Sequence, residues 1–267
     1  MKFNVIKEEV WKFPPTLNRY GKSRFPHDIK NIIYIESDDF PHQVIMTSDL
    51  HSHSIELFRR LEKIIPLGDF HVITAGDMSG KLIMGPDSDS DTTPFYQEIL
   101  PKVKSLYLIQ GNHDLPPPAP SHLRNILANK DGTRPYLEDG KMQNTPLGRV
   151  GGVHGIISNK PHPYKKSEWK YLDDLREFRK PKNKPDILIT HDTPKFIYNN
   201  QEFIGNYKIY DEILKIKPKM YLYGHCHHHE IHTVHEGINF FNLDGRVLIW
   251  NAKQPLPQEL PQELPQE

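Results

Sequence analysis

The sequence has almost no cysteine and no long hydrophobic run. Cys226 is the one cysteine among 267 residues, so an internal disulfide is excluded and a reducing compartment is indicated. No apolar stretch approaches the length that crosses a membrane. The first fifteen residues are charged throughout and lack the apolar segment of a secretory signal. We therefore expect a cytoplasmic protein without a membrane partner.

The charge of the chain has no dominant sign. Lys+Arg and Asp+Glu both number 34, so the formal net charge is zero when histidine is neutral. Such a chain has no overall positive field that would attract nucleic acid, although a local basic face is still allowed. With 36% hydrophobic and 25% charged residues, the composition is that of a globular protein.

The two ends of the chain differ from its middle. Residues 254–267 form a proline-rich Pro/Gln/Glu repeat that suits neither a helix nor a strand interior, so we expect a disordered tail. Residues 1–40 contain Pro14, Pro15 and Pro26, and we expect an irregular segment that wraps the core, with one strand at 32–35. Residues 1–253 are then a single domain.

Short apolar runs alternate with helical patterns through the middle of the chain. The runs are too short for helices and predict buried strands at 44–47, 71–75, 106–110, 187–190 and 220–223. The helical patterns cover 54–64, 121–129, 167–179 and 207–216, with Ser167 as the expected N-cap of the third. This alternation predicts an α/β architecture. Further strands are expected at 231–234, 238–243 and 246–250, with Asp244–Gly245 as a hairpin turn between the last two.

A polar residue suited to metal binding follows each of the five buried runs. In an open α/β sheet, ligands bind beyond the carboxyl ends of the strands, so we expect these side chains to meet. Carboxylate, amide and imidazole donors together suit Mn²⁺, iron or Zn²⁺. Seven donors exceed one octahedral ion, so the sequence predicts two divalent metal ions with a shared carboxylate, Mn²⁺ being the expected ion and iron or Zn²⁺ the alternatives. The seven are Asp49, His51, Asp77, Asn112, His191, His225 and His227.

The run GHCHHHEIH at 224–232 holds five of the sixteen histidines. In extended backbone, residues i and i+2 point the same way, which selects His225 with His227 and, in the same manner, Asp49 with His51. Cys226 would then point away, into packing. His53 is interpreted as a helix-surface residue within reach of a substrate, and His154 as a minor candidate for the pocket. The remaining histidines nearby are interpreted as surface or packing residues: His228, His229, His232 and His235.

These motifs, in this order, resemble the five motifs of the calcineurin-like metallophosphoesterase superfamily. They are Asp49-Leu50-His51, Gly76-Asp77, Gly111-Asn112-His113-Asp114, His191 and Gly224-His225-Cys226-His227. The resemblance implies an α/β fold with two β-sheets packed face to face and helices outside. It implies that Asp49, His51 and His227 hold one ion, that Asn112, His191 and His225 hold the other, and that Asp77 bridges them. His113 would protonate the leaving oxygen, with Asp114 orienting its ring.

The activity implied by the resemblance is hydrolysis of a phosphate mono- or diester. Two ions bind one phosphate and lower the pKa of a shared water, and the resulting hydroxide attacks phosphorus in line. Lys81 stands where phosphoprotein phosphatases carry the arginine of GDxxDR, which argues against that activity. The balanced charge favours a small phosphoester or nucleotide as substrate. A nuclease acting on DNA or RNA is the alternative, and a non-catalytic scaffold with this fold is a third, which the complete motifs argue against.

Overall fold

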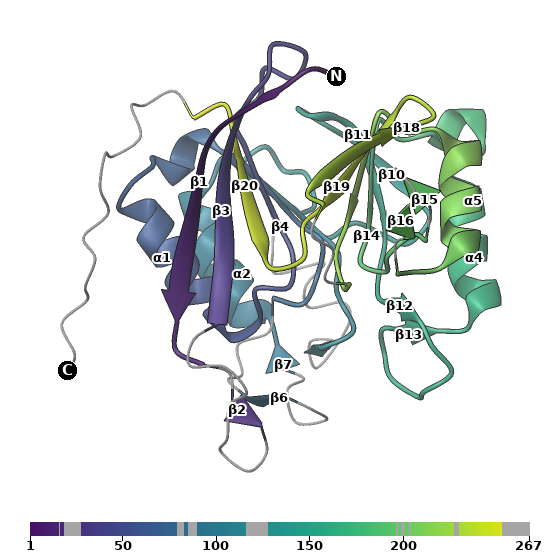
Figure 1. Cartoon of the computed structure of the whole chain (residues 1–267), viewed down its shortest axis with the longest axis horizontal. Helices are drawn as coiled ribbons and strands as arrows, with labels where there is room; N and C mark the ends of the chain where they lie inside the picture. Colours follow the sequence, from purple (N-terminus) through teal and green to yellow (C-terminus); the bar gives the residue numbers. More distant parts are fainter. Residues whose placement is uncertain are drawn as a thin grey trace.

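Three clusters of buried apolar side chains separate four layers of secondary structure. The first lies between one sheet and the helices α1 (Ser54–Glu62) and α2 (Thr93–Ile99), and the second lies between the two sheets. The third lies between the other sheet and the helices α4 (Glu168–Glu177) and α5 (Tyr207–Ile216). Figure 1 shows the two sheets face to face with helices on both outer sides, as predicted.

This computed structural model describes residues 1–15, 17–18, 28–78, 83–84, 90–115, 128–195, 197–198, 201–202, 204–226 and 230–252. The predicted helix at 121–129 falls mostly outside these residues, as do His227, His228, His229 and the tail at 254–267. Residues 128–129, at the end of that predicted helix, are not helical. Among the described residues, no helix has the length and apolar character needed to cross a membrane.

Each large sheet has six strands, and both are mixed. In spatial order the first sheet contains β1 (Asn4–Phe13), β3 (Asp28–Glu36), β20 (Arg246–Trp250), β4 (Val44–Thr47), β5 (His71–Thr74) and β8 (Ser105–Leu108). The second contains β10 (Met142–Thr145), β11 (Gly148–Val153), β14 (Ile187–Thr190), β17 (Met220–Tyr223), β19 (Ile238–Asn242) and β18 (His232–His235). Four short pairs complete the described strands: β2 (Leu17–Asn18) with β6 (Ile83–Met84), β7 (Ser90–Asp91) with β9 (Asp114–Leu115), β12 (Ile156–Ile157) with β13 (Lys165–Lys166), and β15 (Ile197–Tyr198) with β16 (Gln201–Glu202).

The five predicted buried strands are confirmed as β4, β5, β8, β14 and β17. Every residue in them is buried, because helices cover one face of each sheet and the other sheet covers the opposite face. A strand covered on both faces needs apolar residues at successive positions, which explains their continuous apolar runs. β4, β5 and β8 are parallel neighbours, and so are β14 and β17, so their carboxyl ends point the same way within each sheet.

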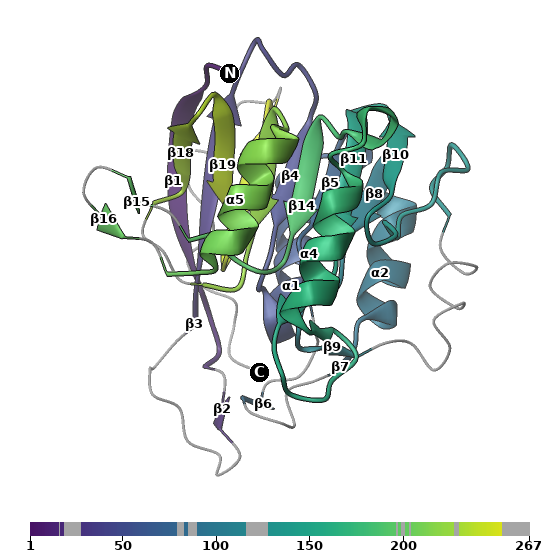
Figure 2. The same cartoon turned by 90° about the vertical axis from the view of Figure 1, so that its right-hand side faces the viewer.

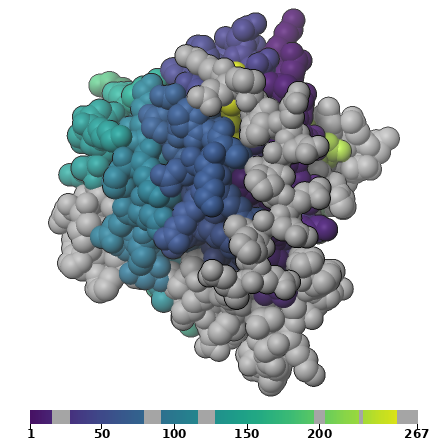
Figure 3. Space-filling model, turned by 90° about the vertical axis from the view of Figure 1, so that its left-hand side faces the viewer, coloured from purple at the N-terminus to yellow at the C-terminus, as the bar shows by residue number. Residues whose placement is uncertain are grey.

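The two helices that cover the second sheet, α4 and α5, begin at side-chain caps. Ser167 precedes α4, and its hydroxyl accepts a hydrogen bond from the Lys170 N–H at 3.4 Å, which confirms the predicted cap. Asn206 caps α5 in the same way, through the Lys208 N–H. α2, which carries a proline in its first turn, was not predicted. Figure 3 shows the outer face over the first sheet, where α1 and α2 form the blue and teal surface.

The N-terminal segment corrects the expectation of an irregular wrap. β1 and β3 form a long antiparallel pair, with Trp11 opposite Lys30 and Phe13 opposite Asp28. β3 also pairs with β20, so the N-terminal residues extend the first sheet rather than coat it (Figure 2). Trp11 and Phe13 are buried in the cluster beneath α1. The described strands β1 and β3 therefore belong to the first sheet and contribute buried side chains to its core.

The predicted hairpin at Asp244–Gly245 is wrong. β19, before this turn, belongs to the second sheet, whereas β20, after it, pairs with β3 and β4 in the first. The turn therefore carries the chain from one sheet to the other. A true hairpin does occur nearby, where β18 and β19 pair through Glu236 and Gly237.

His71 should make the stability of the protein sensitive to acid. Its ring is buried beside Ser105, with Nδ1 2.6 Å from the Ser105 Oγ. Burial, with the nearby Lys104 and His42 charges, lowers the pKa of His71 from 6.5 to about 4. Between these values the unfolded chain takes up a proton that the folded chain does not, so stability falls as the pH falls. His71→Gln should remove up to about 2 kcal/mol of this loss at pH 5.

The measurement is thermal unfolding at pH 7 and pH 5. The wild-type melting temperature should drop more between these values than that of His71→Gln. A His162→Gln variant, in the surface loop between β12 and β13, is the control and should keep the wild-type drop. Equal drops in the wild type and His71→Gln would show that His71 does not contribute.

Candidate metal centre

Predicted ligands from both sheets meet where the sheets face each other. Asp49 and Asp77 follow β4 and β5, and Asn112 follows β8, all in the first sheet. His191 and His225 follow β14 and β17 in the second sheet. The five strand ends thus belong to two sheets rather than to one open sheet, and the site spans the junction between them.

Four of the predicted ligands have left-handed backbone. The φ angles are 57° at Asp49, 51° at His51, 52° at Asp77 and 72° at His225. Residues other than glycine adopt this conformation at a cost, and such residues concentrate at functional sites. The Asp49 N–H donates to the Gly76 carbonyl at 3.0 Å, and the His51 N–H donates to the Asp77 carbonyl at 2.9 Å. These bonds join the β4 and β5 loops, so the two strained turns support each other.

Two glycines allow the loops to approach this closely. A Cβ on Gly111 would lie 2.1 Å from Asp77 Oδ1, and one on Gly224 would lie 2.4 Å from Asp49 Oδ2. Any side chain at either position would displace a carboxylate of the site.

Asp77 lies at the centre of the site and is buried. Its Oδ1 accepts the His113 N–H at 2.8 Å, and its Oδ2 lies 3.2 Å from His191 Nε2. The same Nε2 lies 3.1 Å from Asn112 Oδ1, while His191 Nδ1 lies 2.8 Å from the Ala75 carbonyl. With Nδ1–H donating to Ala75, Nε2 is directed at Asp77 and Asn112, as expected of a histidine that shares a cation with them.

Asp49 is fixed by hydrogen bonds on one of its carboxylate oxygens. Oδ2 accepts the Ser48 hydroxyl at 2.6 Å and the His225 N–H at 3.1 Å. Oδ1 accepts no hydrogen bond in the described part of the chain, so it is the oxygen available to a metal ion.

Asp114 fastens the loop of Asp77 to that of Gly111. Its carboxylate is fully buried and accepts N–H groups from Asp77 at 2.9 Å, Met78 at 3.0 Å and Gly111 at 2.8 Å. The half-buried His113 lies beside His51, with 5.6 Å between the ring centroids. Orientation of the His113 ring by Asp114 stays a prediction.

The pKa values of the buried carboxylates indicate a site that favours a bound cation. Burial and the charge on Asp244 raise the pKa of Asp49 to about 7, and burial and the charge on Asp77 raise the pKa of Asp114 to about 8. Burial alone would also raise the pKa of Asp77, but His191, His51 and His113 outweigh it and hold that pKa well below its ordinary value. Carboxylates gathered out of water need a proton or a cation to compensate them.

The imidazoles of the site divide into two kinds. Burial lowers the pKa of both His51 and His225 to about 4, so both rings are neutral and can donate a lone pair to a metal. Burial acts the same way on His191, but the charges of Asp77 and Asp49 raise its pKa well above the ordinary value. A divalent ion would take the place of that proton.

These residues fit a divalent metal ion. Ligand atoms of Asp49, Asp77 and His191 all lie within 4.8 Å of one another, and all three residues are buried. Asn112 lies against His191, and the His225 ring centroid is 5.3 Å from that of His191. Carboxylate, amide and imidazole donors are the set that Mn²⁺, iron and Zn²⁺ accept. Thus the structure brings together most of the predicted set, and His227 is outside the described residues.

The other histidines differ partly from expectation. His53 is buried rather than on a helix surface, and its Nε2 lies 2.9 Å from Asp28 Oδ2. His154 is buried too, with Nδ1 accepting the Gln110 N–H and Nε2 against the Leu137 carbonyl. With both nitrogens used, His154 supports the loop after β8 instead of reaching a substrate. His232 packs against Phe3 and Phe241, as its packing interpretation expects.

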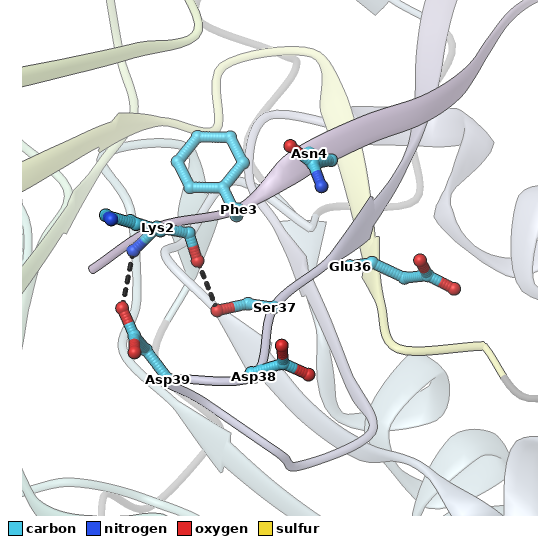
Figure 4. Close-up of a pocket in the computed structure, with 7 residues that line it drawn as sticks. All are labelled: Lys2, Phe3, Asn4, Glu36, Ser37, Asp38 and Asp39. Carbon is cyan, nitrogen blue, oxygen red and sulfur yellow. Dashed lines mark hydrogen bonds between the residues drawn. The ribbon is translucent and has the colours of Figure 1, made fainter.

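A cavity of about 340 Å³ lies at the opposite end of the first sheet (Figure 4). It is lined by Lys2, Phe3 and Asn4 near the N-terminus and by residues 36–39 at the end of β3, and the Lys2 N–H donates to Asp39 Oδ2 at 2.6 Å. β4 runs antiparallel to β20, which runs parallel to β3, so the carboxyl end of β4 lies near the start of β3, whereas this cavity lies near the end of β3. The cavity is therefore separate from the candidate metal centre.

Comparison with known proteins agrees with this geometry. Residues 42–229, more than half of the chain, match the calcineurin-like phosphoesterase family. The protein belongs to this family. A metal-dependent phosphoesterase is accordingly the general class that its sequence and its buried Asp49, Asp77 and His191 support.

Solved structures support the fold. The protein TT1561 of Thermus thermophilus is similar with a TM-score of 0.53 and 14% sequence identity, over 75% of this chain and 88% of that chain. A Saccharomyces cerevisiae serine/threonine phosphatase, described as similar to human phosphatase PP5, matches with a TM-score of 0.31 and 11% identity, over 81% of this chain and 70% of that chain. A TM-score of that size does not establish a shared fold. No curated protein matches the sequence.

Proposed function

We propose that this protein hydrolyses a small phosphate mono- or diester at a pair of divalent metal ions, preferably Mn²⁺. The observation that carries the proposal is the convergence of carboxylate, amide and imidazole donors, one from each of five strand ends and buried except for the half-buried His225, at one place between the sheets. Asp49 and His51, with His227, would hold one ion. Asn112, His191 and His225 would hold the other, and Asp77 would lie between them.

Two divalent ions at these positions would neutralise the charge of a phosphate and activate a water. The residues of the chain have separate tasks around them. Asp77 carries negative charge to the centre of the site, and its Oδ1 also holds the main chain of His113. His113 is half-buried at the edge of this cluster, where its imidazole would donate a proton to the leaving oxygen.

The distribution of basic residues favours a small substrate over nucleic acid. The two lysine-rich segments of the second half, at 160–170 and 179–184, lie at opposite ends of α4, a helix of ten residues that is about 15 Å long. Several of their charges are also engaged in ion pairs within the chain. Lys166 pairs with Asp139 at 2.8 Å and Asp174 at 3.0 Å, and Arg179 pairs with Glu212. This local pairing supports a small substrate over nucleic acid.

The test is a substrate panel with Mn²⁺-loaded protein. It should include 4-nitrophenyl phosphate, bis(4-nitrophenyl) phosphate, cyclic nucleotides, dinucleotides and single-stranded DNA. We expect turnover of a small ester, with kcat/KM nearly constant between 50 and 200 mM salt. A protein that grips six to ten phosphates loses about 10³- to 10⁵-fold in affinity over that range. Tight, strongly salt-dependent binding and degradation of the oligonucleotide would favour the nuclease alternative, and no turnover of any substrate would favour the scaffold.

A further inference from the structure

A lysine is buried directly behind the metal centre. Lys30, on β3, is only 8% exposed, and its Nζ donates a hydrogen bond to the main-chain carbonyl of Asp49 at 2.8 Å. Burial lowers the pKa of Lys30, and the charges of Asp49, Asp244 and Asp28 act against this. A charge removed from water is destabilising unless nearby groups compensate it. The burial of the Lys30 ammonium group must therefore be compensated by the groups that it contacts.

The topology of the first sheet brings Lys30 to Asp49. β20 lies between β3 and β4, and the turn before β20 contains Gly245. The Gly245 N–H donates to the Ser48 carbonyl at 3.1 Å, and the Gly245 carbonyl accepts the Asn31 N–H at 3.3 Å. A Cβ on Gly245 would lie 4.0 Å from Lys30 Nζ, so the lysine side chain runs alongside this turn to its target.

Lys30 binds the main-chain carbonyl of Asp49, which accepts no other hydrogen bond among those of the described residues. The N–H of Asp49 is held by the Gly76 carbonyl, and its Oδ2 is held by Ser48 and His225. The carbonyl of Asp49 is held by Lys30. Since Asp49 has a φ of 57°, its peptide groups need such contacts on both sides to keep the strained conformation.

We propose that Lys30 is a positioning residue of the metal centre, which holds the main chain of Asp49 so that the free carboxylate oxygen of Asp49 faces the metal ion. The proposal rests on the function proposed above. Lys30, on β3, and Asp244, in the turn before β20, both lie outside residues 42–229, so this support comes from parts of the chain that the family match does not include. Lys30 is in turn surrounded by further contacts. The charge of Asp28 acts on Lys30, and the Asp28 carboxylate lies against the His53 ring. The centroid of that ring lies 5.0 Å from the centroid of the Phe13 ring.

The experiment must separate the loss of the hydrogen bond from Lys30 to Asp49 from the loss of the positive charge of Lys30. Lys30→Met removes the hydrogen bond but also a positive charge, and the lost repulsion would by itself favour metal binding. The double variant Lys30→Met/Asp244→Asn removes one charge of each sign, which leaves the net charge of the cluster unchanged and avoids an uncompensated buried carboxylate. The probes are Co²⁺, whose visible absorption reports its coordination geometry, and Mn²⁺, whose affinity is measured by calorimetry.

In the double variant the Co²⁺ bands should shift, and Mn²⁺ binding should weaken by about 10- to 100-fold, the usual effect of losing an outer contact to a metal ligand. Asp244→Asn alone and Lys166→Met should keep the wild-type Co²⁺ spectrum. Lys166 is a matched control, because it too is a largely buried lysine between two carboxylates, Asp139 and Asp174.

A wild-type Co²⁺ spectrum and Mn²⁺ affinity in the double variant would overturn the role of Lys30. So would the same spectral change in Asp244→Asn alone, because the effect would then belong to Asp244. In both cases the wild type would still bind its ions, and the proposed function would stand. If the wild-type protein bound neither ion, the proposed function would fail, and the role of Lys30 with it.

Discussion

Replacing Asp77 by asparagine should abolish metal binding and turnover together. The substituted side chain would have nearly the same shape and could still accept the His113 N–H through its amide oxygen, but it would carry no charge. The ions would lose the charge of a carboxylate whose oxygen lies, among the described residues, within 4.8 Å of ligand atoms of both Asp49 and His191. The loss of Mn²⁺ affinity should therefore exceed the roughly 10- to 100-fold that removal of an outer-shell partner causes.

The measurement is metal content after reloading with Mn²⁺, together with turnover of the best substrate from the panel. The wild type should hold about two ions per chain, as two-metal sites do. Asp69→Asn, an exposed position beside β5, is the control and should retain both. Full metal occupancy in Asp77→Asn would exclude Asp77 as the bridging ligand, whatever happened to turnover.

The candidate ligands could be predicted because the pattern that marks them lies within a few residues of each one in the sequence. A strand buried on both faces needs an unbroken apolar run, so the polar residue that ends the run is conspicuous. Asp49, Asp77 and His191 each stand within two residues of such a run, and the structure places them together. A glycine next to a ligand is a second local signal. Gly111, before Asn112, is needed because the backbone there passes too close to the Asp77 carboxylate for any side chain.

The arrangement of the strands depends on contacts that no local pattern records. The strand ends predicted to share one sheet belong to two, because a buried run has the same composition in either. Asp244–Gly245 has the composition of a hairpin turn, yet it connects the sheets, because β20 pairs with β3 and β4 rather than with β19. Turn chemistry specifies the bend of the chain and not the partner of the strand that follows it.

Lys30 shows the same limit at the level of one side chain. In the sequence Lys30 stands before the strand predicted at 32–35, in a segment expected to be irregular, where a lysine is ordinarily exposed to solvent. Its contact with Asp49 arises from pairing between β3, β20 and β4, which are far apart in the chain. Prolines within the first 26 residues favoured an irregular segment, and the long β1–β3 pairing outweighs that local preference.

Replacing His113 by alanine should keep both metal ions and slow the reaction. The hydrogen bond between this residue and Asp77 comes from the main-chain N–H, so the substitution leaves it intact and should leave the Asp77 carboxylate in place. What is lost is the imidazole, which lies beside His51 at the edge of the cluster. A positioned general acid contributes about 10²- to 10⁴-fold, and turnover of a substrate with an alkyl leaving group should fall within that range.

The loss should depend on the leaving group, which separates proton donation from a structural role. A nitrophenolate leaves without needing a proton, so His113→Ala should hydrolyse nitrophenyl esters at nearly the wild-type rate while it fails on alkyl esters. Rates for a series of esters whose leaving groups span several pKa units would give a steeper dependence on leaving-group pKa in the variant than in the wild type. If the imidazole instead only shapes the site, hydrolysis of nitrophenyl and alkyl esters should slow by the same factor. The dependence of rate on leaving-group pKa should then be the same in the variant and the wild type. Metal content measured on the same samples distinguishes this result from that of Asp77→Asn, where every ester should lose turnover because the ions are gone.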